Sequence, residues 1–369
     1  MQRIVFVLAA AVVLAPQSRA QQGEAIEVPL AVRGLDPVEL CQGREAQGRP
    51  DLTLDRGGYT YRFASPSSRD TFQTEPERYE IQMAGACARM GPLSGRGDPA
   101  RFAVHDGRIY IFASDACRKG FLAAPERHLD RRDPIPELSE TQRTAGRDLL
   151  AQAVEAHGGA PEIDATKTLR MLSHRRVLYG KEPYHVRREW LAVFPERTIL
   201  QTSWNSDVWT QVLDGERGVM VSAEGERPMA TCQRDEHRAQ WHRQFLPLLR
   251  ARTRDDFVAG ALGRGEIAGL TVDRVAVAFA GKTLELGIDP VSHRLVALRC
   301  TARVGGPFAE LEQRFEDFRE VGGLLLPYTV RVRVDGKDAP REDVSWTAIE
   351  RDMPVDEALF AEQAQRHGK

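Results

Sequence analysis

The chain has 369 residues, which is long enough for two ordinary domains, and its 51 basic and 53 acidic residues give a net charge of −2. Apolar residues make up 42% and charged residues 28%, a composition typical of a protein with a hydrophobic core and not of a disordered chain. So balanced a charge offers no broad electrostatic attraction for nucleic acid, and we expect no nucleic-acid partner.

The first twenty residues have the pattern of a secretory signal peptide. Arg3 supplies the positive start, residues 4–15 form an apolar run, and the small residues Ser18 and Ala20 precede the expected cleavage site. As a helix this run spans about 18 Å, which is short of the ~30 Å hydrocarbon core of a membrane. We therefore assign 1–20 as a signal peptide and expect a periplasmic or secreted protein with no transmembrane segment in the mature chain.

An internal repeat follows the signal peptide. Residues 58–79 match residues 107–128 at a constant offset of 49, without a gap. In each copy a glycine turn enters a short strand with alternating aromatic residues, and a serine at the N-cap position, Ser65 or Ser114, begins a short helix. Phe72 and Phe121 are placed to pack these helices onto the strands. The repeat predicts two strand–helix units that share one small core.

This region resembles the YHS domain and defines a first domain at about 30–130. The resembling segments are Gly34-Leu35-Asp36-Pro37-Val38, Pro76-Glu77-Arg78-Tyr79, Gly85-Ala86-Cys87-Ala88 and Asp98-Pro99. Metal-handling relatives of this family carry a cysteine after the Asp-Pro-Val segment and two more in a Phe-Cys-Ser-x-x-Cys segment. The corresponding residues here are Glu39, Ala64 and Ser68 in the first copy, and Ala113 and Cys117 in the second. Only Cys117 keeps the family pattern.

Three cysteines, Cys41, Cys87 and Cys117, lie in this first domain. In an exported protein they indicate one disulfide and one remaining thiol. The alternative is a three-thiolate site for Cu(I) or Zn²⁺, with His105 or His128 as a fourth ligand. The spacings of 46 and 30 residues are not those of a metal-binding motif, and they favour the disulfide. We expect no other cofactor.

A charged, proline-containing linker at 131–139 separates the first domain from the second. Ser139 and Gln142 form a capping-box pattern, which predicts a helix up to His157. From residue 168 the apolar period changes to two, which indicates strands. The candidate strands are 168–179, 184–194, 197–204, 208–214, 218–222, 270–280, 283–289, 294–301, 309–319, 324–335 and 343–350.

Short turns with glycine or proline join most of these strands, which predicts one large, curved antiparallel sheet. Residues 237–250 interrupt the strands with a helix whose apolar stripe would cover the sheet. His237 and His242 are interpreted as surface residues of that helix. A disulfide between Cys232 and Cys300 would tie the preceding loop to the sheet. The fold class is therefore α+β: a small duplicated strand–helix domain and a curved antiparallel half-barrel with a covering helix.

The second domain, at about 140–365, resembles the LolA/LolB-like family of periplasmic lipoprotein carriers. The resemblance rests on the segment 315–327, the turn Leu286-Gly287-Ile288-Asp289-Pro290 and the terminal Leu359-Phe360. It implies a half-closed barrel lidded by helices, with an apolar cavity between sheet and helix. An acyl chain would gain about 0.8 kcal/mol per buried methylene in such a cavity.

Large apolar residues of this domain are the candidate ligand-facing side chains: Trp190, Trp204, Trp209, Trp241, Phe245 and Leu249. The alternative is that they simply fill the interior as core. A cavity is favoured because a broad curved sheet needs more filling than one short helix provides.

The sequence contains no nucleophile elbow, phosphate-binding loop, dinucleotide fingerprint or zinc-protease motif, and we expect no enzymatic activity. The leading hypothesis is an exported cell-envelope protein that binds an apolar ligand such as a lipid or acyl chain. The first domain would then be an accessory module, and another envelope protein a partner. The alternatives are a metal-handling protein that uses the three cysteines of the first domain, and a structural protein with a filled half-barrel.

Overall fold

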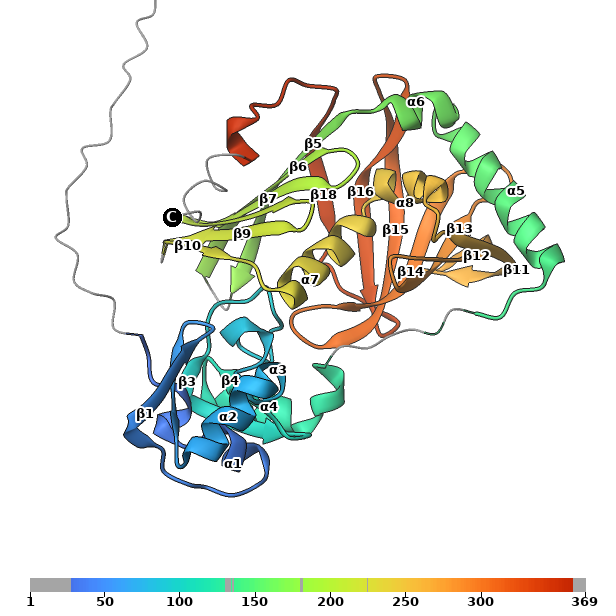
Figure 1. Ribbon diagram of the computed structural model, residues 1–369. Helices are drawn as coiled ribbons and strands as arrows, with labels where there is room; N and C mark the ends of the chain where they lie inside the picture. The colour runs from blue at the N-terminus through green and yellow to red at the C-terminus, as the bar shows by residue number, and fades with distance from the viewer. Residues whose placement is uncertain (1–27, 130–133, 135, 180–181, 224, 361–369) are drawn as a thin grey trace, which may run out of the picture.

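The structure is a computed structural model that describes residues 28–129, 134, 136–179, 182–223 and 225–360. The predicted signal peptide 1–20 lies outside the described residues, as do part of the predicted linker and the end of the second domain. Figure 1 shows the small N-terminal domain beside a much larger C-terminal sheet.

The N-terminal domain repeats in space as it does in sequence. Strands β1 (Arg49–Arg56) and β2 (Tyr59–Phe63) and helix α2 (Pro66–Thr74) recur 49 residues later as β3 (Asp98–His105), β4 (Arg108–Phe112) and α4 (Asp115–Ala123). Each pair of strands is an antiparallel two-stranded sheet. Ser65 and Ser114 cap α2 and α4, and Phe72 and Phe121 are fully buried against the strands. The other elements are α1 (Pro37–Cys41), α3 (Pro76–Tyr79) and the short turns η1 (Ala31–Gly34), η2 (Met83–Gly85) and η3 (Pro125–Arg127).

Asp36 holds the start of this domain together. It is the N-cap residue of α1, and its carboxylate is completely buried. The carboxylate accepts hydrogen bonds from the backbone N–H groups of Val38 (2.9 Å), Glu39 (3.2 Å) and Ala64 (2.7 Å), and from the hydroxyl of Ser68 (2.7 Å). These four bonds replace the water that burial removes. One side chain thus fastens α1 to β2 and α2.

The C-terminal domain begins with α5 (Glu140–Ala156), whose capping box between Ser139 and Gln142 is present as predicted. Gly158, in the left-handed region with φ 115°, separates α5 from α6 (Gly159–Ala165). The strands before the covering helices are β5 (Thr168–Tyr179), β6 (Glu182–Val193), β7 (Arg197–Trp204), β8 (Asp207–Asp214), β9 (Arg217–Ser222) and β10 (Gly225–Pro228). After α7 (Thr231–His242), α8 (Phe245–Arg250) and the turn η4 (Ala251–Thr253) come β11 (Val258–Ile267), β12 (Leu270–Phe279), β13 (Lys282–Ile288), β14 (Leu295–Arg303), β15 (Phe308–Val321), β16 (Leu324–Val334), β17 (Lys337–Asp338) and β18 (Val344–Arg351).

Within the described residues these strands form one antiparallel sheet of 14 strands and no closed barrel. Its order is β10-β9-β8-β7-β6-β5-β18-β16-β15-β14-β13-β12-β11, and β17 adds to β16. Strand β18, the last strand of the described residues, therefore lies between β5 and β16 and joins two meanders. The sheet curves, and α5, α7 and α8 lie on its inner side (Figure 1). The predicted curved antiparallel sheet is confirmed.

The covering helix predicted at 237–250 is two helices. Pro247 has no N–H, and its ring would clash with the carbonyl of Arg243 in a continuous helix, so the chain breaks at 243–244 and α8 starts at Phe245. Helix α7 also begins earlier than predicted, at Thr231. Its inward side carries the polar residues Gln233 and His237, which an apolar stripe does not reveal.

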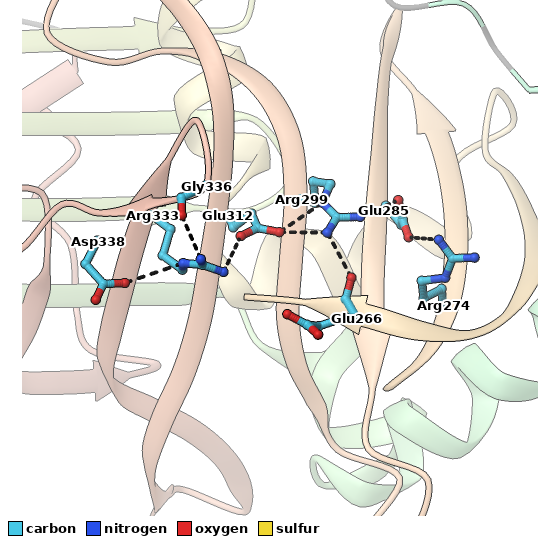
Figure 2. Close-up of polar contacts among 8 residues, drawn as sticks. All are labelled: Glu266, Arg274, Glu285, Arg299, Glu312, Arg333, Gly336 and Asp338. Carbon is cyan, nitrogen blue, oxygen red and sulfur yellow. Dashed lines mark hydrogen bonds and ion pairs between the residues drawn. The ribbon is translucent and has the colours of Figure 1, made fainter. Parts of the chain in front are cut away.

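Ion pairs from five adjacent strands, β12 to β16, run across the outer face of the sheet (Figure 2). Glu312 is only 3% exposed and lies between Arg299 at 2.7 Å and Arg333 at 3.1 Å. Arg299 also reaches Glu285 at 3.5 Å, and Glu285 pairs with Arg274 at 3.1 Å. Because side chains alternate along a strand, this charged outer row leaves the apolar row facing the helices.

Candidate functional site

Four of the six predicted ligand-facing residues form the core under the helices. Trp190, Trp241, Phe245 and Leu249 are between 0% and 8% exposed. The rings of Trp190 and Trp241 lie 5.4 Å apart, and Phe245 meets the edge of Phe315 at 5.1 Å. These side chains join the sheet to α7 and α8.

The other two predicted residues lie farther along the same face of the sheet. Trp190 stands opposite Leu200, and Trp209 stands opposite Thr202, two residues along β7 from Leu200. Trp204 is half-buried, and Trp209 is 47% exposed. The inner face therefore continues past the buried core to an aromatic surface that water reaches.

The two histidines of α7 are not surface residues, contrary to the sequence interpretation. His237 is fully buried; its Nδ1 donates to Gln211 Oε1 (2.9 Å), and its Nε2 accepts from the Thr198 hydroxyl (2.7 Å). His242 is half-buried against Phe279, with the rings 5.4 Å apart. Burial lowers the pKa of each imidazole to about 4, so both are neutral at pH 7.

The sequence predicts a sizeable apolar cavity under the helices, whereas the structure has small cavities there. One of about 30 Å³ lies between His242, Phe279 and Leu284. Another, of about 20 Å³, lies beside Phe245 and Phe315. Each has room for about one or two water molecules. The space is filled because all residues of α8 from Phe245 to Leu249 are buried and α5 adds its own apolar side.

A much larger cavity of about 510 Å³ opens at the end of the half-barrel, between the two domains. We call it the mouth cavity. The N-terminal domain contributes Gln82, Met83, Pro92 and Tyr110; the second domain contributes Cys232, Asp235, Glu236, Arg238, Ala239, His242, Ala280, Gly281, Lys282, Arg303 and Phe308. Its volume is that of an ordinary small-molecule site. Six of these residues also line the 30 Å³ inner cavity, so the two spaces adjoin: Glu236, Ala239, His242, Lys282, Arg303 and Phe308.

The wall of the mouth cavity combines charged and apolar groups. Arg303 Nε pairs with Glu236 at 3.2 Å, and both side chains are largely buried. The guanidinium of Arg303 also lies over the ring of Phe308, 4.2 Å from its centroid. Apolar surface from Met83, Ala239 and Phe308 stands beside this ion pair. Such a wall suits a ligand with one polar and one apolar part.

Polar contacts join the two domains beside the mouth cavity. Gln233, at the start of α7, is 1% exposed and donates from Nε2 to the carbonyl of Pro92 (2.8 Å). At a separate, exposed point Arg127 pairs with Asp335 at 3.1 Å. The buried hydrogen bond links α7 directly to the N-terminal domain.

The cysteines are arranged differently from the predicted metal site. Among the described residues no group of three or more His, Cys, Asp or Glu side chains could hold a metal ion, so Cys41, Cys87 and Cys117 do not form a three-thiolate set. Cys87 and Cys117 lie together in one apolar cluster, whereas Cys41 packs against another. No disulfide joins any of the five cysteines in the structure, so neither the predicted Cys232–Cys300 bond nor the one predicted among Cys41, Cys87 and Cys117 is formed. Cys300 lies on the inner face of β14, and Cys232 is exposed in α7.

The sequence analysis missed the residues of the mouth cavity. They come from α7, from the ends of β13 to β15 and the β12–β13 turn, and from the N-terminal domain; Tyr110 lies in the repeat, but the repeat does not mark it as a cavity residue. The residue types gave no signal either, because a lysine or arginine at a strand end, such as Lys282 or Arg303, is usually solvated. Only the folded chain brings them together.

No family profile matches the chain, and no curated protein matches it. Among solved structures, a DUF1329 family protein from Desulfovibrio piger is similar with 12% identity and a TM-score of 0.41, over 60% of this chain and 98% of that one. A putative outer membrane lipoprotein-sorting protein domain from Vibrio parahaemolyticus has 8% identity and a TM-score of 0.39, over 60% and 98%. A LolA superfamily protein from Nitrosomonas europaea has 12% identity and a TM-score of 0.37, over 57% and 94%. None of the helices in the described residues is long and apolar enough to span a membrane.

Proposed function

We propose that this protein is a periplasmic carrier of an amphiphilic ligand, such as a lipid or the acyl chain of a lipoprotein. The polar part of the ligand occupies the mouth cavity, and its apolar part extends into the half-barrel beneath α7. The observation that carries this proposal is the contact between the 510 Å³ mouth cavity and the 30 Å³ inner cavity across six shared residues.

Helix α7 is the lid in this proposal, because the closed half-barrel has no room for an acyl chain. Polar groups hold much of α7: His237 bonds to Thr198 and Gln211, and Gln233 bonds to Pro92. Water can replace such bonds at a small net cost of about 1 kcal/mol each when the helix lifts. The break at 243–244 lets α7 move while α8 stays buried.

The lifted helix would expose an apolar channel on the inner face of the sheet. Trp190, Phe245 and Leu249 would line its deep part, and Trp204 and Trp209 its exposed end. Trp241 would face the channel from the underside of the lifted α7. Each acyl methylene that enters such a channel gains about 0.8 kcal/mol. In this proposal the N-terminal domain is an accessory module that closes one side of the mouth through Met83, Pro92 and Tyr110.

A substitution in the wall shared by the two cavities tests the proposal. Ala239 lines both cavities, so Ala239→Trp would fill the passage between them. We expect binding of the fluorescent fatty acid cis-parinaric acid to weaken at least about tenfold, which is a loss of 1.4 kcal/mol. Ala151→Trp, on the exposed side of α5, is the matched control and leaves binding unchanged.

Native mass spectrometry gives a second readout. Protein purified gently from the periplasm is expected to carry a bound amphiphile that Ala239→Trp protein lacks. A wild-type chain that neither carries such a ligand nor binds cis-parinaric acid would overturn the proposal. Equal binding by wild-type and Ala239→Trp protein would show that the mouth cavity does not take part in ligand binding.

A further inference from the structure

The two copies of the repeat carry different residues at one equivalent helix position. Ser68 in α2 and Cys117 in α4 are equivalent at the offset of 49, and each donates its backbone N–H to the capping serine at 3.1 Å. In the first copy the Ser68 hydroxyl reaches back to Asp36, which precedes β1 (2.7 Å). The Cys117 side chain stands in the same place in the second copy.

Cys87 is the residue that Cys117 meets. Cys87 lies ahead of β3 in the chain, as Asp36 lies ahead of β1. It forms a parallel β-bridge with Ile111 of β4, and Ile111 lies shortly before Ser114, the N-cap of α4. Ala88, the residue after Cys87, donates its N–H to the carbonyl of Ile111 (3.0 Å). The Cys87 side chain is 1% exposed, and Cys117 packs against the same apolar cluster.

The two thiols have different surroundings. Cys117 is half-buried at the first turn of α4, whereas Cys87 is enclosed. Although partial burial opposes it, hydrogen bonds from Ser114 and Cys87 and the guanidinium of Arg89 lower the pKa of Cys117. Burial raises the pKa of Cys87. A dithiol exchange pair needs one accessible thiol that readily forms the attacking thiolate, and a second thiol beside it that completes the exchange.

We propose that Cys87 and Cys117 are a reversible dithiol–disulfide pair that exchanges with an external disulfide compound, with Cys117 as the attacking thiol and Cys87 as the resolving thiol. The other cysteines take no part, since Cys41 packs in a different cluster and Cys232 and Cys300 belong to the second domain. The exchange needs no ligand in the mouth cavity, although Met83 and Tyr110 of the same apolar cluster line that cavity.

The chemistry is a balanced two-step exchange. The Cys117 thiolate attacks one sulfur of the external disulfide, forms a mixed disulfide and releases the other sulfur as a thiolate that takes up a proton. Cys87 then loses its proton to solvent, and its sulfur attacks the Cys117 sulfur and expels the second half of the external compound as a thiol. The two cysteines are oxidised by two electrons, and the external disulfide is reduced to two thiols.

Oxidised and reduced glutathione serve as the test compounds for the full chain. After equilibration over a range of ratios, free thiols are alkylated under acid quench and denaturation and mapped by peptide mass spectrometry. We expect Cys87 and Cys117 to lose alkylation together in one two-electron transition, with a Cys87–Cys117 disulfide peptide in their place. Cys41, Cys232 and Cys300 remain alkylated across that transition.

Two variants separate the roles of the pair. Cys117→Ser restores the residue of the first copy, so the fold has a precedent for it, and Cys87 should then stay alkylated. Cys87→Ser should trap Cys117 as a mixed disulfide with glutathione. Cys232→Ser, at an exposed thiol, is the control and should leave the transition unchanged.

The wild-type chain supplies a readout that needs no variant. Cys117 should react with a disulfide reagent at least about tenfold faster than Cys41, because burial raises the pKa of Cys41 to about 12. A Cys87 that stays reduced at every glutathione ratio, or that pairs with Cys41, would overturn the proposal. A Cys117 no faster than Cys41 would overturn its role as the attacking thiol.

Discussion

His157 joins the end of α5 to two strands of the sheet. It is fully buried; its Nδ1 donates to the carbonyl of Leu325 (2.7 Å), and its Nε2 accepts from the N–H of Leu295 (3.0 Å). Phe245 and Phe318 pack on the ring at 4.8 and 5.4 Å. Only the neutral imidazole can make both hydrogen bonds, because the charged form has no acceptor. The residue that ends the helix is therefore also part of the core.

This arrangement predicts that the protein loses stability in mild acid. Burial lowers the pKa of His157 to about 4, whereas the unfolded chain titrates near 6.5. The stabilising contribution is complete above pH 6.5 and is lost as the pH falls toward 4, by about 3 kcal/mol. Urea unfolding at pH 7 and pH 5 should show about 2 kcal/mol of this loss. His157→Gln keeps a donor and an acceptor but cannot titrate, so its unfolding free energy should depend less on pH; an unchanged dependence would contradict this account.

Asp36 explains why the Gly34–Val38 segment has its particular sequence. Asp36→Ala would leave the N–H groups of Val38, Glu39 and Ala64 without their acceptor. We expect a loss of about 3 kcal/mol or more in the unfolding free energy of the N-terminal domain. Asp98→Ala is the control, since Asp98 is partly exposed and accepts from one backbone N–H, that of Ala100. Equal losses in the two variants, measured by thermal and urea unfolding, would rule out the anchoring role of Asp36.

Helix α5 crosses β11 at a point where both elements carry glycine. A Cβ on Gly146 would lie 2.5 Å from the Cα of Gly260, and a Cβ on Gly260 would lie 2.6 Å from Leu138. The two backbones can touch only without side chains. This contact also explains why β11 was missed: its segment 258–267 contains three glycines, which weaken the strand pattern. Gly260 serves the crossing of α5, whereas a Cβ on Gly265 would meet the side chain of Arg274.

Gly146→Ala should therefore lower the unfolding free energy, whereas glycine-to-alanine substitutions at exposed helix positions usually raise it. Alanine favours an exposed helix over glycine by about 1 kcal/mol, but here the added methyl meets backbone, and we expect a net loss of about 1–3 kcal/mol. Thr144→Ala, at an exposed position of α5, should instead be neutral or slightly stabilising. Chemical denaturation of both variants provides the comparison. A stabilised Gly146→Ala protein would show that the crossing can relax.

One buried hydrogen bond near the mouth cavity contributes to the contact between the domains. Gln233→Ala would remove the bond to Pro92 and leave that buried carbonyl without its partner. We expect faster amide hydrogen exchange at 87–94 and 231–242, by roughly five- to thirtyfold for a loss of about 1–2 kcal/mol. Arg127→Ala breaks an exposed ion pair and should leave exchange there unchanged. Unchanged exchange in Gln233→Ala protein would mean that the domains do not depend on this bond.

The sequence by itself determined the elements whose signals are local. The offset of 49 predicted both copies of the strand–helix unit, and Ser139 with Gln142 predicted the start of α5, because turns, caps and repeats act over a few residues. Period-two alternation likewise gave β5 and β7 with their observed bounds. The apolar residues of the half-barrel core were found too, since the inner-face residues beneath the helices must leave water.

Only the tertiary structure decided how that interior is used. The sequence could not tell whether Trp190 and Trp241 line a cavity or fill a core, because that depends on the volume that α8 and α5 occupy. It could not pair Cys87 with Cys117, since the two meet only when the segment before β3 folds against the start of α4. The mouth cavity likewise exists only where two domains meet. Long-range contacts set these features, and no local pattern in the chain encodes them.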